Sequence, residues 1–196
     1  MKIPRAGTDS SFIALTQPWQ AEPGFQDGQV HLAWESHSFQ LRVEMTDAQV
    51  VSSASADSQW LYLLGDTLEV FLLEPGAPAY FELHISPDNF HNALRWPLGA
   101  IEGVRQENGT RLEDFQIAPD CFASRVTLSP RGWDVEIDIP PQLLGRAAWT
   151  HGQELLISVS RYDYAESNGT PILSTTSAHR VKNFHLIEDW RKFTLV

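Results

Sequence analysis

Residues 132–140 read Gly-Trp-Asp-Val-Glu-Ile-Asp-Ile-Pro, and they decide the fold class. Every second residue from Trp133 to Ile139 is large and apolar, and each residue between them is acidic. A β-strand points successive side chains to opposite sides, so this alternation is typical of a strand with one buried and one solvated face. The stretch therefore predicts a β-sheet with one face packed on a core.

Strands of the same kind flank connections that are rich in turn residues. Phe122–Leu128 precedes the quoted stretch across a Ser-Pro-Arg-Gly segment, and Phe39–Thr46 alternates after Val30–Glu35. Asp66–Leu73 and Ala79–Ser86 flank a connection with two prolines, which cannot donate to a strand ladder. We therefore expect two antiparallel hairpins in the first half of the chain, with the strands from Asp66 and Ala79 as neighbours.

The rest of the chain completes an all-β pattern. Phe90–Trp96, Leu155–Tyr162 and Phe193–Val196 are further expected strands, Pro97–Asp120 is a loop with at most one short strand, and Pro140–Gly145 suits one helical turn. About eight to ten short strands without regular βα alternation predict a two-sheet antiparallel β-sandwich of jelly-roll or immunoglobulin-like type. We expect residues 1–196 to form one domain.

The composition restricts the partners and the compartment of the protein. The formal net charge is -11 at pH 7, whereas nucleic acids and anionic membranes bind clustered lysine and arginine. No stretch approaches the roughly 20 apolar residues that span a bilayer. The N-terminus lacks the apolar core of a secretory signal, and the single cysteine, Cys121, allows no internal disulfide. We therefore expect a soluble cytoplasmic protein without nucleic-acid or membrane partners, secreted only if a signal has been removed.

Four segments carry a resemblance to a known family. They read Gly-Asp-Thr-Leu-Glu-Val-Phe-Leu at 65–72, Tyr-Phe-Glu-Leu-His-Ile-Ser-Pro at 80–87, the quoted stretch at 132–140, and an aromatic tail over 183–195. In this order the chain resembles the family 9 carbohydrate-binding modules and their DOMON-like relatives. The resemblance implies a non-catalytic β-sandwich that holds a sugar, or a similar polar small molecule, in a polar pocket between two aromatic residues.

The chain departs from the pattern of the sugar-binding members. Trp60 lies further before Asp66 than their clamp tryptophan does, so Tyr62 or Leu63 takes that place, and Phe184 stands where the second tryptophan is expected. In those members an arginine follows the aromatic of the second motif, whereas here Glu82 does. The polar groups of this pocket are therefore expected to differ from those of a glucose binder.

Polar residues that interrupt apolar strands are the candidates for the pocket floor. Glu82 and His84 share one face of their strand, and the alternative for both is a solvated outer face. Arg161 could donate to a ligand oxygen or form a fixed ion pair with Glu69. The candidate ligand-binding residues are Trp60, Tyr62, Glu69, Glu82, His84, Arg161, Phe184 and His185.

Other ligand chemistries are weaker candidates. Asp66 and Asp88 offer hard oxygen donors of the kind that calcium accepts, and the resemblance implies structural calcium in some members. No other cofactor is expected, because no zinc-type spacing of histidine and cysteine is present. Met45 could ligate a b-type haem, as in some DOMON relatives, but it lies on the apolar face of its strand. No nucleophile motif or phosphate loop indicates an enzyme. A structural or protein-interaction module on the same fold remains the alternative function.

Overall fold

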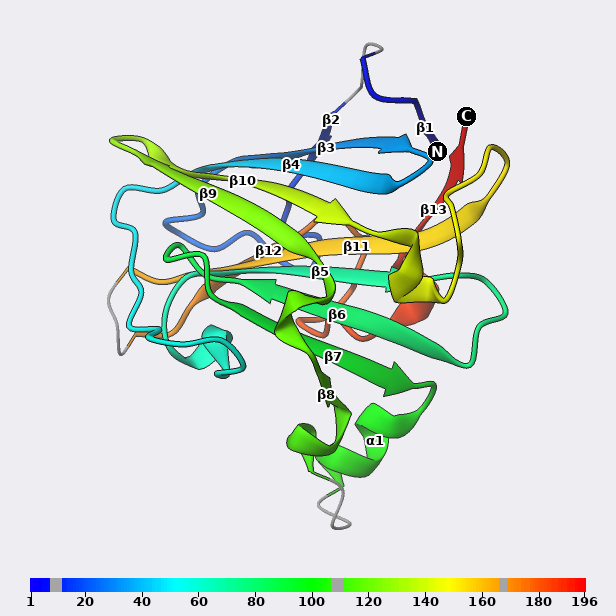
Figure 1. Cartoon of the computed structure of the whole chain (residues 1–196). Helices are drawn as coiled ribbons and strands as arrows, with labels where there is room; N and C mark the ends of the chain where they lie inside the picture. The colour runs from blue at the N-terminus through cyan, green and yellow to red at the C-terminus, as the bar shows by residue number, and fades with distance from the viewer. Residues whose placement is uncertain (8–11, 107–110, 166–168) are drawn as a thin grey trace.

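Two β-sheets packed face to face make up most of the protein (Figure 1). The computed structural model describes residues 1–7, 12–106, 111–165 and 169–196. The smaller sheet runs in the order β2 (Phe12–Ala14), β3 (Gly28–Glu35), β4 (Ser38–Thr46), β10 (Gly132–Ile139) and β9 (Ala123–Ser129). The larger sheet runs in the order β1 (Lys2–Ile3), β13 (Arg191–Leu195), β11 (Glu154–Asp163), β5 (Thr67–Leu73), β6 (Ala79–Ile85), β7 (His91–Pro97) and β8 (Gln116–Ile117), and β12 (Ile172–Thr175) also pairs with β11.

The strand pairings confirm the expected β-sandwich. β3 pairs with β4 and β5 pairs with β6, both antiparallel, so the two predicted hairpins are present. Among the described strands only β1 and β13 pair in parallel. The short strands β1, β2 and β12 were not expected, because two to four residues are too few to show an alternating pattern, whereas β8 is the one short strand that the segment Pro97–Asp120 allowed.

Short helical segments connect the strands. The turn predicted at Pro140–Gly145 is a 3-10 turn over Pro141–Leu144, and Gly145 ends it with a left-handed φ of 68°. The loop after β7 also contains α1 (Ala100–Arg105), which the sequence did not reveal. The remaining 3-10 turns lie at Leu61–Leu63, Leu112–Phe115, Pro119–Cys121 and Ile187–Asp189. No helix in the described ranges has the length and apolarity needed to cross a membrane.

The main core lies between the two sheets. Trp133, Val135 and Ile137 of β10 are at most 1% exposed, as the alternation predicts. Trp34 and Trp149, which we also expected in the core, are equally buried. Apolar residues of the larger sheet, such as Val70 of β5, pack against them from the other side.

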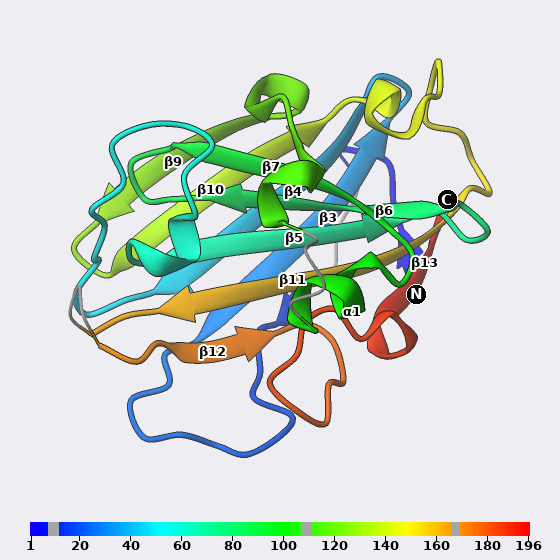
Figure 2. The ribbon, with the colours of Figure 1, turned by 90° about the horizontal axis from the view of Figure 1, so that it is seen from below.

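Strands β5 and β6 are unusual because all seven residues of each are buried. One face of these strands packs on the main core, and the other belongs to a second cluster that includes Phe71, Tyr80 and Trp96. Segments from α1, from the 3-10 turn Leu61–Leu63 and from the chain before β13 cover this second face. Figure 2 views the larger sheet from that side, with α1 in front of it. Polar residues of β5 and β6 are therefore enclosed on the outer face of the sheet.

The start of β10 provides a test of the sandwich. Gly132 has a φ of 144°, and a Cβ added there would lie 1.9 Å from the Met45 carbonyl oxygen of the paired strand β4. Gly132→Ala should therefore lower the free energy of unfolding by more than about 2 kcal/mol, since strain and a backbone clash add. Gly76→Ala, at a φ of 84° with open space around it, is the matched control and should cost only about 1 kcal/mol. Equal losses in urea denaturation would contradict this close approach of β10 to β4.

Candidate functional site

A pocket of about 270 Å³ opens on the covered face of the larger sheet. Its floor comes from β5, β6, β7 and β11, and its walls come from the 3-10 turn Leu61–Leu63, from α1 with the turn after it, and from residues 182–185. The size suits part of a small ligand. The lining residues are Trp60, Tyr62, Glu69, Glu82, His84, Leu94, Trp96, Ile101, Val104, Arg105, Leu112, Tyr162, Leu173, Lys182, Asn183, Phe184 and His185.

Glu82 is the fully paired carboxylate of the floor. Its Oε2 accepts a hydrogen bond of 2.6 Å from the indole Nε1 of Trp96, and its Oε1 lies 2.7 Å from Nε2 of His84. Nε2 of His185 lies 3.9 Å from the same carboxylate, and Nδ1 of His185 bonds the Tyr80 hydroxyl at 2.7 Å. Glu82 therefore holds the surrounding rings in place.

Glu69 is the carboxylate that the protein leaves incompletely paired. Its Oε1 lies 3.3 Å from Nε2 of His84, which already bonds Glu82 at the shorter distance. Within the described ranges no lysine or arginine forms an ion pair with Glu69, although only 2% of the residue is exposed. A buried carboxylate of this kind has acceptor capacity for a ligand donor.

A row of polar side chains crosses the covered face of the sheet at the level of Glu69, and its members Glu69 and His84 line the pocket. Strand register places His84 beside Glu69, and Asn92 of β7 beside His84. His84 Nδ1 and Asn92 Nδ2 are buried, and neither has a hydrogen-bond partner in the described part of the chain. Leaving such groups unpaired costs about 1–3 kcal/mol each, which favours a polar ligand or solvent at this level.

Burial and mutual charge set the protonation of the floor. Burial, with a smaller contribution from the charge of Glu82, raises the pKa of Glu69 to about 8 despite the nearby His84. Burial opposes ionisation of Glu82, but His185, His84 and the Trp96 hydrogen bond outweigh it and lower its pKa. Burial opposes the charge on His84 as well, yet Glu69 and Glu82 together raise its pKa. Near pH 7 the floor therefore holds an ionised Glu82 and a Glu69 that retains its proton, and the two carboxyl groups favour the charged form of His84.

Aromatic rings form one wall above this floor. The ring of Tyr162 lies 5.6 Å from that of Tyr62 and 5.7 Å from that of Phe184. Tyr62 in turn meets His84 edge-on at 6.0 Å. Trp60, half-buried, also lines the pocket. The site thus combines apolar ring faces with a buried carboxyl group, that of Glu69.

Three solved structures share this architecture. A Bacteroides uniformis protein to which carbohydrate binding has been attributed superposes with a TM-score of 0.76 at 13% identity, over 95% of this chain and 87% of that chain. A family 9 carbohydrate-binding module from Caldicellulosiruptor kristjanssonii matches in complex with cellotriose, with a TM-score of 0.70 at 14% identity over 100% and 92% of the two chains. The same kind of module from that organism in complex with glucose matches with a TM-score of 0.66 at 15% identity over 100% and 95%.

The fold is that of the family 9 carbohydrate-binding modules. The expected resemblance is thereby confirmed at the level of structure. The sequence itself matches no protein-family model and no curated protein.

Most of the predicted site residues meet in the pocket of this family 9 fold. Seven of the eight line it, namely Trp60, Tyr62, Glu69, Glu82, His84, Phe184 and His185. The alternative of a solvated outer face is wrong for Glu82 and His84, which are 5% and 1% exposed. Tyr162 is a lining residue that sequence reasoning missed, although strand alternation places it opposite its neighbour Arg161.

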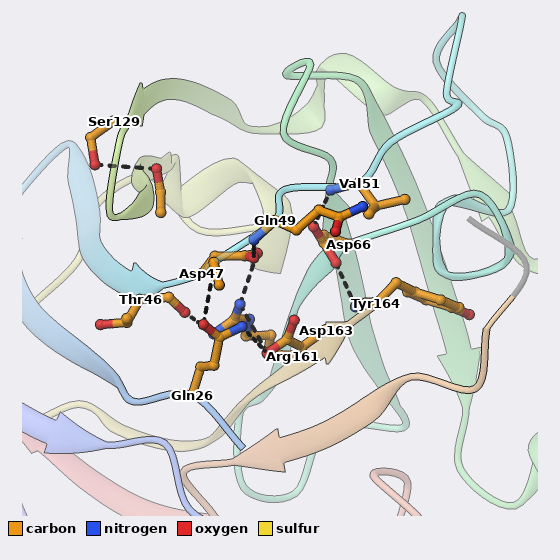
Figure 3. A network of polar contacts seen from close by, with 12 residues as sticks. Gln26, Thr46, Asp47, Gln49, Val51, Asp66, Ser129, Arg161, Asp163 and Tyr164 are labelled. Atoms are coloured by element: carbon orange, nitrogen blue, oxygen red, sulfur yellow. Dashed lines mark hydrogen bonds and ion pairs between the residues drawn. The ribbon is translucent and has the colours of Figure 1, made fainter. Parts of the chain in front are cut away.

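Arg161 does not line the pocket and lies on the other face of β11. Figure 3 shows its side chain directed toward Asp47 and Thr46. Its guanidinium donates to the Thr46 carbonyl at 2.8 Å and to Asp47 at 2.9 Å, and it lies 3.2 Å from Asp163. The expected roles of donor to a ligand or partner of Glu69 are therefore wrong. The apolar residues at positions 157 and 159 already indicated this orientation, because alternate strand residues share a face.

Asp66 and Asp88 do not form a joint cation site. Asp66 is buried and accepts hydrogen bonds from the backbone N–H groups of Val51 and Tyr164, at 2.6 and 2.7 Å (Figure 3). Asp88 is exposed. Asp66 instead lies near the carboxylates of Asp47 and Asp163. The guanidinium of Arg161 already supplies a positive charge to those two carboxylates. The positive charge beside Asp47 and Asp163 is thus supplied by the protein itself, and structural calcium stays a prediction.

Other parts of the molecule are less suited to a ligand. A hollow of about 800 Å³ lies beside β2, β3 and β4, but there Glu44 already pairs with Arg42 and accepts a hydrogen bond from Gln29. Met45, the residue considered for haem, is 3% exposed and packs in the main core. Cys121 is half-buried against the same core, and burial raises the pKa of its thiol to about 11.

The raised pKa of Glu69 should appear in the pH dependence of stability. The folded protein holds this proton up to about pH 8, whereas the unfolded chain releases it near the ordinary value of 4.5, so ionisation of Glu69 destabilises the fold as pH rises between these values. Glu69→Gln should therefore gain in free energy of unfolding relative to the parent protein as the pH is raised from 5 to 9. Urea denaturation at both pH values measures this gain. A gain that is independent of pH would contradict a proton retained on Glu69.

Removing Arg161 should damage the fold without involving the pocket. Arg161→Ala leaves the buried Asp47 carboxylate uncompensated and should cost about 3–5 kcal/mol of unfolding free energy. Arg125→Ala, which removes the exposed pair with Glu136, is the control and should change stability little. A fully stable Arg161→Ala protein would show that this network does not join the two sheets.

Proposed function

We propose that the protein is a non-catalytic module that binds a carbohydrate in the pocket over Glu69. The observation that carries the proposal is the incompletely paired Glu69 carboxylate at the base of a pocket with aromatic walls. A sugar ring has C–H groups on its faces and hydroxyls around its rim. Aromatic ring faces pack against the C–H groups, and a buried acceptor receives a hydrogen bond from a rim hydroxyl.

The comparisons support this class of ligand. The two Caldicellulosiruptor kristjanssonii modules with the same fold hold cellotriose and glucose, and the Bacteroides uniformis protein has been assigned carbohydrate binding. Since identities of 13–15% establish the fold alone, the ligand must be argued from this chain's own residues. Tyr62, Tyr162 and Phe184 provide the apolar wall, and Glu69 provides the acceptor.

The arrangement of the floor favours binding over catalysis. Glycoside hydrolysis commonly uses two carboxyl groups that both face the scissile bond. Here both oxygens of Glu82 are engaged by Trp96 and His84, which leaves Glu69 as the one available carboxyl. The net charge of -11 likewise favours a small-molecule ligand over nucleic acid or an anionic membrane.

Calorimetric titration of Glu69→Ala against cellotriose and glucose tests the proposal. Glu69 retains its proton near pH 7, so its hydrogen bond with a sugar hydroxyl is a neutral one that contributes about 0.5–1.5 kcal/mol, and the variant should bind up to about tenfold more weakly than the parent protein. Glu136→Gln, on the solvent side of the smaller sheet, is the control and should bind as the parent does.

Phe184→Ala is a second test, in which both binding affinity and stability should fall. Phe184 lines the pocket but is only 4% exposed and packs on Trp19, Phe71 and Tyr162. Its truncation should therefore weaken binding and also lower stability by about 3–5 kcal/mol. Absence of saccharide binding by the parent protein on a broad glycan array, or unchanged affinity in Glu69→Ala, would contradict the proposed function.

A further inference from the structure

At the deep end of the pocket two carboxyl groups share one imidazole. Glu69 and Glu82 both face Nε2 of a single imidazole, that of His84. His185 also approaches Glu82, but burial lowers the pKa of this histidine and so disfavours its charged form. Once Glu82 is paired with His84, the ionised form of Glu69 would lack a counterion. A ligand cation beside the Glu69 carboxylate would supply this counterion.

The cations at the mouth of the pocket do not fill this place. Lys182 lies 2.7 Å from Glu22, and Arg105 donates to Asn183 at 2.8 Å and lies 3.7 Å from Glu102. Both side chains are more than 40% exposed. Their charged groups are thus held at the surface by other partners and do not pair with Glu69.

We propose that the ligand is an amino sugar, whose amine enters the pocket first and lies as an ammonium group beside the Glu69 carboxylate. This inference rests on the proposed carbohydrate-binding function and narrows its ligand class. An ammonium group has three donors and a full positive charge, whereas a hydroxyl offers Glu69 one neutral donor. The Tyr62 and Tyr162 rings, which line the same pocket, also attract a cation.

The proton balance of the complex is simple. An amine that arrives as the free base accepts the proton of Glu69, and the product is an ammonium carboxylate pair. An ammonium ion instead pairs with ionised Glu69 and displaces the proton of that residue into solvent. Both routes end in the same complex. The groups that face Glu69 are His84 and Glu82 on β6, Tyr162 on β11 and Tyr62 on the turn before β5.

Three trisaccharides with the same β-1,4 backbone test the inference. Cellotriose carries a hydroxyl at C2, tri-N-acetylchitotriose an acetamide and chitosan trimer an amine. Calorimetry in the presence of a chelator, which removes metal ions, should give an affinity for the amino trimer about tenfold above that for cellotriose, as expected for a charge-assisted in place of a neutral hydrogen bond. The pair of 6-amino-6-deoxyglucose and glucose makes the same comparison of an amine with a hydroxyl, at C6 instead of C2.

Glu69→Gln separates charge from hydrogen bonding. The amide keeps an acceptor oxygen but cannot ionise, so the preference for the aminated sugar should fall to within about twofold, while cellotriose affinity changes much less. Glu136→Gln, the same change on the solvent side of the smaller sheet, is the matched control and should retain the preference. Thermal unfolding of each variant verifies that it is folded.

The outcomes distinguish this inference from the function on which it rests. If neutral sugars bind and neither aminated probe exceeds its hydroxyl parent, the amino-sugar inference is wrong and the carbohydrate-binding proposal stands. If the preference is present but survives in Glu69→Gln, the inference is wrong about the recognising group. If none of the five saccharides binds, the result contradicts both.

Discussion

Burial of β5 and β6 on both faces is the constraint on which the site depends. A strand of a β-sandwich normally has one solvated face, where charged side chains need no fixed partner. Here α1, the turn before β5 and the chain before β13 cover the second face, and Glu69, Glu82 and His84 are enclosed with it. Because buried charges must be paired, these three residues interact closely with one another.

The buried charges are paired differently on the two faces of the larger sheet. On the inner face Arg161 meets Asp47 and the Thr46 carbonyl of the other sheet, and the network joins the two layers. On the outer face Glu82 is paired through Trp96 and His84, but Glu69 keeps its proton and unused acceptor capacity. The inner network is thus complete within the protein, whereas the outer one has a place for a ligand group.

The sequence predicts these features unevenly. The strict alternation around Val135 reports one-sided burial directly, and the sandwich and its hairpins follow from such patterns. In β6 the tripeptide Glu82-Leu83-His84 also alternates, yet its polar side is buried, because segments distant in the sequence cover it. No local pattern contains that information. Arg161 is the opposite case. Its apolar neighbours at alternate positions indicated an inward orientation, but a ligand-binding role was expected because the side chain is charged.

The central claim is that the ligand occupies the covered face of the larger sheet, with Glu69 as its deepest contact. A crystal structure of the protein with a bound trisaccharide tests this claim most directly. The account predicts sugar density between Tyr62, Tyr162 and Phe184, with one polar atom of the sugar within hydrogen-bond distance of the Glu69 carboxylate. Density over the smaller sheet, or a sugar in the pocket that makes no contact with Glu69, would contradict it.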